Sequence, residues 1–392
     1  MITIPTIQEL YAEEVAAIES EFGDAMPLFG KVFLRALAAA RGAIRWLIYI
    51  RIAKLQKNIF VDTADPESSG GTLERFGRVK LNRDPFPARA GVYTLEVTGN
   101  VGATIAAKTV FKSDDENANP GKLFILDSSY TLVATTDEIT VRALEAGLDS
   151  KLNIGETLTA TAPIIGVNQS AEVTAETTEP QAAEDIEDYR AKVIDAYRLE
   201  PQGGAATDYR LWAFDAQGVK QVYPYAKSGS AGEIDVFVEA TIADSTDNHG
   251  TPSAQLLVDV ADVIEFDPDT TRPLNERGRR PLGVFALNVK PVTPLKVDIT
   301  VSSYSNLTAN KQAAIEAALA DLVNGIRPFV AAADILEDRN DLLDSNRIVA
   351  AILNAVPGSS FGAITIAIDN SIVSSQLFTQ GNIPYYNSVT FV

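Results

Sequence analysis

The stretch PQGGAATDYRLWAFDAQGVKQVYPY, residues Pro201–Tyr225, decides how the second half of the chain is interpreted. A glycine pair opens it, aromatic residues follow at helical spacing, and a further glycine leads into an apolar run typical of a strand. Backbone N–H groups at a helix start can bind phosphate, but no basic residue stands beside the glycine pair. We therefore predict that Gly203 and Gly204 shape the entry to a helix, whose Tyr209 and Trp212 dock on a sheet or a neighbouring subunit.

Around this stretch, helices and strands alternate from about residue 179 onward. The segment AEDIEDYRAKVIDAYR predicts a helix with one apolar face, formed by Ile186, Tyr189, Val193 and Tyr197. Helix caps and stops are expected at Thr207, Gly218, Thr251 and Thr308. Strands are expected at residues 219–225, 233–240, 284–290, 295–301 and 363–368.

The preceding region, residues 63–178, has short β-prone runs separated by turn signals such as DDENANPG. Alternation of Tyr93, Leu95 and Val97 with polar residues predicts a half-buried strand. This region is predicted to be a small β domain.

Residues 1–62 predict two helical segments, at 9–21 and 31–60. The second would span about 45 Å and carries apolar residues on more than one side, which indicates burial on more than one side. Between residues 25 and 61 there are seven basic and no acidic residues, which favours an acidic partner such as another subunit. The interface residues predicted on this helix are Ile44, Trp46, Ile48, Tyr49, Ile52 and Leu55.

Composition argues against several classes of chemistry. The formal net charge of −19 disfavours nucleic acid as a ligand, and the chain has no cysteine and one histidine, His249, in a polar loop. The acidic segment 262–269 matches no EF-hand spacing and is expected to be a solvated turn. We predict no catalytic residues, no metal and no cofactor.

The loop NERGRRPLG contains three arginines, Arg277, Arg279 and Arg280. It is either a solvated loop or a contact to an acidic partner, because guanidinium groups pair well with carboxylates. The first twenty residues lack the basic and apolar regions of a secretory signal, and we expect no transmembrane helix.

Several segments, in order, resemble the baseplate J-like family of wedge proteins from contractile phage tails and related injection systems. They include FVDTADPESSGGTLERFGRVKLNRDPFPARAGVYTLEVTG, ALEAGLDSKLNIGETLT, EDIEDYRAKVIDAYR, the opening stretch, RRPLGVFALNVKPVTPLKVDITV and GNIPYYNSVTFV. Together they cover the chain from about residue 31 onward. The loop TADPESSGGTLERFG is a few residues longer than the family pattern.

The resemblance implies a structural subunit of the virion tail baseplate, assembled in the host cytoplasm, that builds a ring around the tail hub and rearranges when the sheath contracts. It implies pairing with a second copy, a smaller wedge subunit bound through the N-terminal helices, and contacts with other baseplate, hub or sheath-proximal subunits. Nucleic acid and direct membrane insertion are not expected.

The predicted fold class is α+β and multidomain. Long N-terminal helices precede a β-rich domain and then C-terminal α/β parts with helix-strand units, at residues 1–62, 63–178, 179–302 and 303–392. Two alternative functions stay open: a tail-associated hydrolase using carboxylates, and a membrane-surface protein using the basic helix 31–57.

Overall fold

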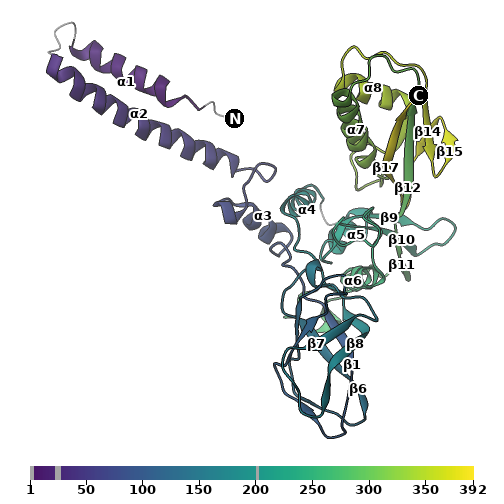
Figure 1. Ribbon diagram of the computed structural model, residues 1–392. Coiled ribbons are helices and arrows are strands. Elements are labelled where there is room, and N and C mark those ends of the chain that lie inside the picture. Colours follow the sequence, from purple (N-terminus) through teal and green to yellow (C-terminus); the bar gives the residue numbers. More distant parts are fainter. Residues whose placement is uncertain (1–3, 23–27, 200–202) are drawn as a thin grey trace. The chain divides into compact units, whose positions relative to one another are not determined.

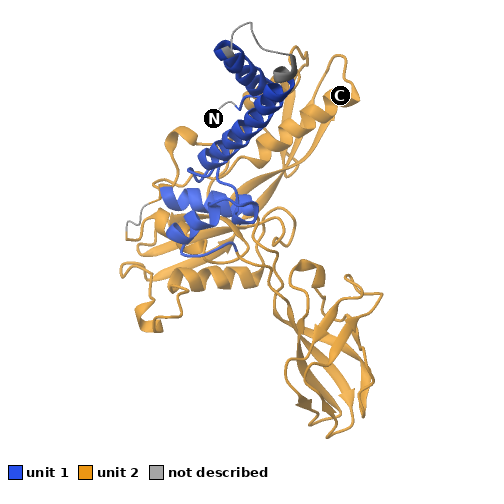
Figure 2. Ribbon diagram, turned by 90° about the vertical axis from the view of Figure 1, so that its left-hand side faces the viewer, with its two compact units in different colours: residues 1–85, 186–197 blue, residues 86–185, 198–392 orange. Residues whose placement is uncertain are grey.

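The computed structural model describes residues 4–22, 28–199 and 203–392, and the chain divides into two compact units (Figures 1 and 2). The first comprises residues 1–85 and 186–197, and the second comprises residues 86–185 and 198–392. Helices dominate the first unit and sheets the second, so the α+β, multidomain fold class is confirmed.

Two long helices run side by side in the first unit (Figure 1). The longer one confirms the predicted segment 31–60, displaced by about one helical turn. The unit contains α1 (Ile7–Phe22), α2 (Leu28–Lys57), the 3-10 turn η2 (Glu67–Ser69), α3 (Leu73–Lys80) and α4 (Ile186–Arg198).

Helix α4 returns to this unit from far along the sequence. Its predicted apolar face is confirmed, because Tyr189 and Val193 are buried against Leu73 and Ala64. The sequence pattern predicts this helix to belong to the α/β part that follows it. The structure instead packs it with α3, since its apolar stripe is complementary to the one on α3.

The second unit begins with a closed six-stranded barrel of strand order β1-β6-β4-β3-β7-β8. The side chains of Tyr93, Leu95 and Val97 all point into its core, as their alternation predicted. The strands and short elements of this region are β1 (Val92–Gly99), β2 (Thr104–Ile105), β3 (Val110–Ser113), β4 (Leu123–Ile125), β5 (Tyr130–Thr131), β6 (Thr136–Ala143), η3 (Leu148–Ser150), β7 (Thr157–Ala160) and β8 (Val167–Thr178).

A three-stranded sheet of order β11-β10-β9 follows. Strands β9 and β10 form an antiparallel hairpin, and β11 returns parallel to β10 after α6. The sheet packs against α5 and α6 through residues such as Tyr209, Val236 and Val260. Its elements are α5 (Ala206–Ala213), β9 (Val219–Ala226), β10 (Glu233–Ala240), α6 (Ala254–Glu265), η4 (Leu274–Glu276) and β11 (Ala286–Pro291).

The last part is a four-stranded sheet of order β15-β14-β12-β17, with α7 and α8 on one face (Figure 1). Strand β17 lies parallel to β12, and a separate two-stranded ladder joins β13 to β16. The elements are β12 (Thr293–Val301), α7 (Ala309–Asn324), η5 (Leu336–Asp338), β13 (Leu342–Asp344), α8 (Ser345–Ala355), β14 (Ile364–Ile368), β15 (Ser371–Val373), β16 (Ser375–Leu377) and β17 (Asn382–Phe391).

Two of the predicted helix caps concern the starts of α7 and α6. Thr308 caps α7 as predicted, because its side chain accepts a hydrogen bond from the backbone N–H of Lys311. The prediction for α6 was wrong, since the N-cap is Ser253 and not Thr251. The Thr251 hydroxyl instead donates to Asp247 at 2.5 Å, which takes it away from the helix start.

Candidate interaction surfaces

One face of α2 is covered by α1. Ala38 is fully buried, and a Cβ at Gly42 would lie 3.2 Å from the backbone nitrogen of Tyr11. Leu10 of α1 is 1% exposed beside these small residues. The two helix backbones therefore approach closely because Ala38 and Gly42 lie one turn apart on the same face of α2.

The same contact is complementary in charge. Glu14 of α1 is 9% exposed and lies 3.5 Å from Arg41 and 3.0 Å from Arg45. Arg45 also reaches Glu13 at 3.2 Å. Two of the basic residues noted in the sequence thus find their acidic partner inside the chain.

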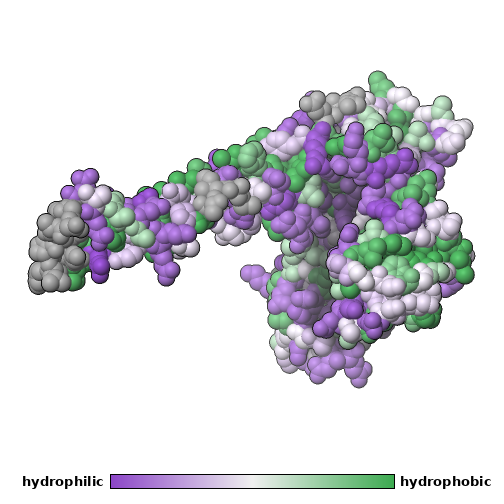
Figure 3. Space-filling model, turned by 90° about the horizontal axis from the view of Figure 1, so that it is seen from above, coloured by the Kyte–Doolittle hydropathy of each residue, from purple (hydrophilic) through white to green (hydrophobic). Residues whose placement is uncertain are grey.

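The opposite face of α2 is apolar and uncovered among the described residues. At 100° per residue, Phe33, Ile44 and Leu55 fall within about 40° of one another, whereas Gly42 lies on the other side of the helix. We call this set the α2 stripe. Figure 3 shows residues of high hydropathy, in green, along the two long helices. Exposed fractions in the α2 stripe are Phe33 70%, Leu37 40%, Ile44 57%, Leu47 55%, Ile48 52%, Ile52 42% and Leu55 66%.

The predicted interface residues on this helix therefore divide into two groups. Ile44, Ile48, Ile52 and Leu55 lie in the α2 stripe, whereas Trp46 and Tyr49 are partly buried and point to other sides. Arg51 was not among the predicted interface residues, but it lies within the α2 stripe at helical spacing from Leu47, Ile48 and Leu55.

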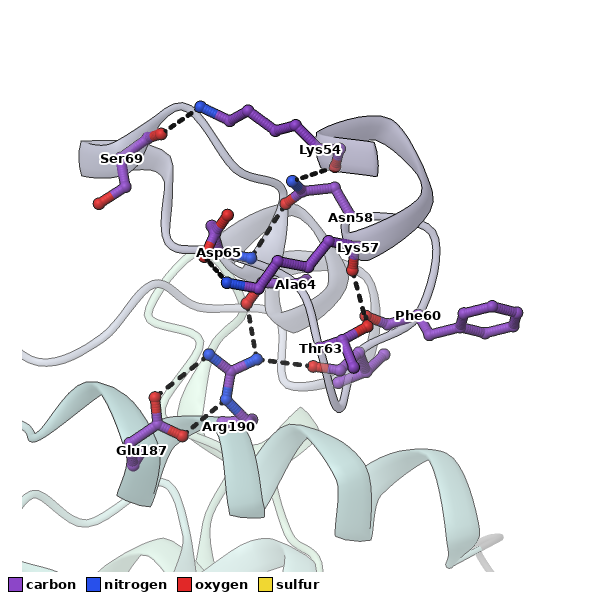
Figure 4. A network of polar contacts seen from close by, with 11 residues as sticks. Lys54, Lys57, Asn58, Phe60, Thr63, Ala64, Asp65, Ser69, Glu187 and Arg190 are labelled. Carbon is purple, nitrogen blue, oxygen red and sulfur yellow. Dashed lines mark hydrogen bonds and ion pairs between the residues drawn. The ribbon is translucent and has the colours of Figure 1, made fainter. Parts of the chain in front are cut away.

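The end of α2 is fixed by a polar network (Figure 4). Arg190 of α4 donates to the carbonyl oxygens of Val61 at 2.9 Å and Ala64 at 2.6 Å. The Nε and Nη2 groups of Arg190 donate to the carboxylate of Glu187. Lys57 pairs with Asp65 at 2.5 Å. This network uses Arg190, the first of the two arginines in the EDIEDYRAKVIDAYR segment, to hold the loop that follows the long helix.

The glycine pair of the opening stretch does not form an open anion site. Both glycines have positive φ, 77° at Gly203 and 113° at Gly204. The backbone N–H groups of Gly204 and Ala205 donate to the carboxylate of Asp208. An incoming phosphate would meet this carboxylate, so the pair shapes the entry to α5, as predicted.

The contacts of α5 differ from the sequence prediction in one respect. Ala205, and not Thr207, occupies the N-cap position, because Asp208 satisfies the first N–H groups. Tyr209 is 1% exposed in the core of the chain's own sheet, and its ring meets Trp212 edge to face at 5.2 Å between centroids. Trp212 itself is partly exposed.

The arginine loop is tied to the chain's own acids. Arg279 pairs with Asp215 at 2.7 Å and Asp267 at 3.4 Å, and Arg280 pairs with Glu265 at 3.1 Å. Arg277 donates to the backbone carbonyl of Asp267 at 3.2 Å. Leu282 within this loop and Phe285 just after it are exposed, with 71% exposure for Phe285.

A buried ionic network joins the three-stranded sheet to the C-terminal part. Glu239 of β10 is 1% exposed and accepts from the Tyr223 hydroxyl at 2.6 Å, from Arg327 at 2.9 to 3.1 Å and from Lys220 at 3.2 Å. Burial opposes ionisation of this carboxyl most strongly. The charges of Arg327 and Lys220, with the Tyr223 hydrogen bond, outweigh burial and lower the pKa of Glu239.

A second ion pair crosses the same junction. Arg210 of α5 has a side chain only 4% exposed and donates to Asp334 at 2.6 Å. Asp334 also accepts from the backbone N–H of Val330 at 2.7 Å. The segment between α7 and β13 is therefore held from both α5 and β10.

The remaining candidates for other chemistry, His249 and the acidic segment 262–269, make ordinary contacts. His249 is exposed and stacks on Tyr385 with 3.8 Å between ring centroids. Asp267 is neutralised by Arg272 and Arg279. Within residues 4–22, 28–199 and 203–392, no three His, Cys, Asp or Glu side chains gather to hold a metal ion. None of the helices in the described residues is long and apolar enough to cross a bilayer.

Comparisons with known proteins match two of these modules. The barrel corresponds to the Baseplate J-like protein barrel domain over residues 94–180, and the three-stranded sheet module to the Baseplate J-like central domain over residues 201–291. In sequence, the chain is 30% identical over 143 residues to the Mu-like prophage FluMu protein gp47 of Haemophilus influenzae, covering 36% of this chain and 38% of the relative. It is 28% identical over 116 residues to the putative protein JayE of Escherichia coli, covering 27% and 44%.

The matched regions thus span about two fifths of the length of these curated relatives. Among solved structures, a chain of the anti-feeding prophage baseplate superposes with a TM-score of 0.42 at 12% identity, over 97% of this chain and 90% of that one. This chain therefore contains two domains of the Baseplate J-like family, the barrel domain followed by the central domain.

Proposed function

We propose that this protein is a structural wedge subunit of a contractile-tail baseplate. In this role it builds the ring around the tail hub and rearranges when the sheath contracts, and it carries no catalytic activity. The presence of these two Baseplate J-like domains supports the assignment to a baseplate. A relative named as a prophage protein is consistent with it.

The observation that carries the assembly role is the α2 stripe. Seven large apolar side chains, each 40% to 70% exposed, line one side of a helix of 30 residues. Contiguous exposed apolar surface of this kind is typical of protein interaction sites. Burying such side chains contributes about 25 cal/mol for each Å² removed from water.

We therefore propose that the N-terminal helices join a bundle with a smaller wedge subunit. The second unit would pair with a second copy and contact other baseplate, hub or sheath-proximal subunits. The four-part division at residues 62, 178 and 302 stays a proposal, as do contacts through Trp212 and the loop that carries Arg277, Arg279 and Arg280. Location in the virion tail follows from the same role.

The test is to co-express this chain with its neighbouring tail genes and to weigh the purified complex by native mass spectrometry. We expect a heteromeric complex that holds two copies of this chain. A truncated chain lacking residues 1–60 should lose the smaller partner and keep its remaining contacts. A lone monomer in both cases would refute the proposal.

A control variant separates assembly from folding. Ile48→Asp with Leu55→Asp places two charges in the α2 stripe, at side chains 52% and 66% exposed. The variant should fold with unchanged helix content, because neither side chain lies in the chain's own core, yet it should lose the partner. Retention of the partner by this variant would assign the binding to another surface.

A further inference from the structure

We infer that the α2 stripe receives an amphipathic, acidic helix of a different polypeptide, which places a carboxylate against Arg51. This inference rests on the proposed assembly role and specifies the chemistry of the partner. It starts from Arg51, a charged residue within the α2 stripe for which the described residues supply no carboxylate.

Arg51 lies in the middle of the exposed apolar residues. Leu47 and Ile48 precede it by one helical turn, Leu55 follows it by one turn, and all three are more than half exposed. In the part of the chain that the structure describes, no carboxylate comes within 4.0 Å of its guanidinium group. A helix that covers these three residues must therefore also cover Arg51.

Burying an arginine without a counter-ion is strongly unfavourable, because the charge loses its hydration. A partner that covers the α2 stripe must thus supply an acid at this position. The contact between α1 and α2 already shows the same solution, since Glu14 of α1 pairs with both Arg41 and Arg45. Apolar contact and acidic pairing occur together there.

A second copy of this chain does not provide such a helix. Helix α2 contains no acidic residue, so the α2 of a second copy offers no carboxylate to Arg51. Helix α1 is acidic, but among the residues whose burial the structure describes, its large exposed apolar side chains are Ile7 at its start and, just before the helix, Ile4. Its 16 residues span about 24 Å, whereas the α2 stripe from Phe33 to Leu55 spans about 33 Å.

The occupant is therefore a longer helix from another subunit, with its own apolar face and a carboxylate within one turn of the contact with Arg51. To identify it, a photo-crosslinking amino acid is placed at position 47 or 55 in the chain co-expressed with its neighbouring tail genes. We expect cross-links to a helical segment of a different polypeptide that contains Asp or Glu. Cross-links to a second copy of this chain would overturn the inference.

The charge is tested by Arg51→Glu, with Arg35→Glu as the matched control. Arg35 is also exposed on α2 and changes the charge equally, but it lies about 160° around the helix from Arg51 and outside the α2 stripe. We expect Arg51→Glu to weaken the complex at least tenfold and Arg35→Glu less than threefold. Replacing the cross-linked acid of the partner by arginine should restore binding to the Arg51→Glu chain.

The outcomes separate the two proposals. If the wild-type complex forms and both variants bind equally well, the inference about Arg51 fails and the assembly role stands. If the wild-type chain forms no complex at all, the proposed function fails and the inference fails with it.

Discussion

Glu239 is the residue whose removal should reveal most about how the second unit holds together. Its carboxylate is buried and has three partners, Tyr223, Arg327 and Lys220. Glu239→Gln keeps the shape and one acceptor but removes the charge. Arg327 and Lys220 then face a neutral amide.

The loss of stability expected in Glu239→Gln depends on how deeply Arg327 and Lys220 are buried. Breaking a buried ion pair by removing one member costs about 3 to 5 kcal/mol. The side chain of Arg327 is 25% exposed and that of Lys220 is 33% exposed, so water can partly rehydrate both. We therefore expect the lower end, about 3 kcal/mol, in the free energy of unfolding of the second unit.

The contribution of Glu239 to stability should decrease as the pH falls. The pKa of Glu239 in the folded chain is below its ordinary value of 4.5. Its contribution to stability is therefore complete above that value and is lost as the pH falls through the folded pKa. In Glu239→Gln this part of the acid destabilisation should be absent.

The assay is urea unfolding followed by circular dichroism between pH 3 and 7, with hydrogen exchange monitored over residues 324–341. Glu233→Gln is the control, since it removes a carboxylate from the same strand that pairs near the surface with Lys227. Equal stability of wild type and Glu239→Gln at pH 7, with unchanged exchange in that segment, would refute the reasoning.

Three further predictions concern other contacts. Gly42→Leu should detach α1 from α2, because even a Cβ at this position would lie 3.2 Å from the backbone nitrogen of Tyr11. Detachment should make proteolysis of α1 faster, and an unchanged rate of proteolysis would contradict this prediction. Arg190→Ala should release the loop after α2 and lower the free energy of opening of this loop by about 2 kcal/mol, because the hydrogen bonds to Val61 and Ala64 are lost. Hydrogen exchange at residues 61–65 should become faster, and unchanged exchange there would show that the loop does not depend on Arg190. Arg279→Ala removes a guanidinium group, 16% exposed, that pairs with both Asp215 and Asp267, and should destabilise the second unit by about 2 kcal/mol in urea unfolding. Loss of assembly without loss of stability would assign Arg279 to a partner contact.

The sequence alone predicted the elements whose signals are local. The long helix, the alternating strand at Tyr93 and the apolar face of α4 follow from periodicity. The role of the glycine pair followed from the lack of nearby basic residues. Such patterns are encoded within a few turns or strand residues, so they are readable without knowledge of the fold.

Only the tertiary structure shows which charged residues are paired with other residues of the same chain. Arg41, Arg45 and Arg279 looked equally available in the sequence, but acids distant along the chain neutralise them. Glu239 lies between the buried residues Val238 and Ala240, and Arg327 from beyond α7 joins Lys220 and Tyr223 in compensating for its burial. Arg51 stands out only because α1 covers the opposite face of α2 and leaves its neighbours exposed. Ion pairs of this kind join residues that are tens of positions apart, so the local pattern of the sequence does not predict them.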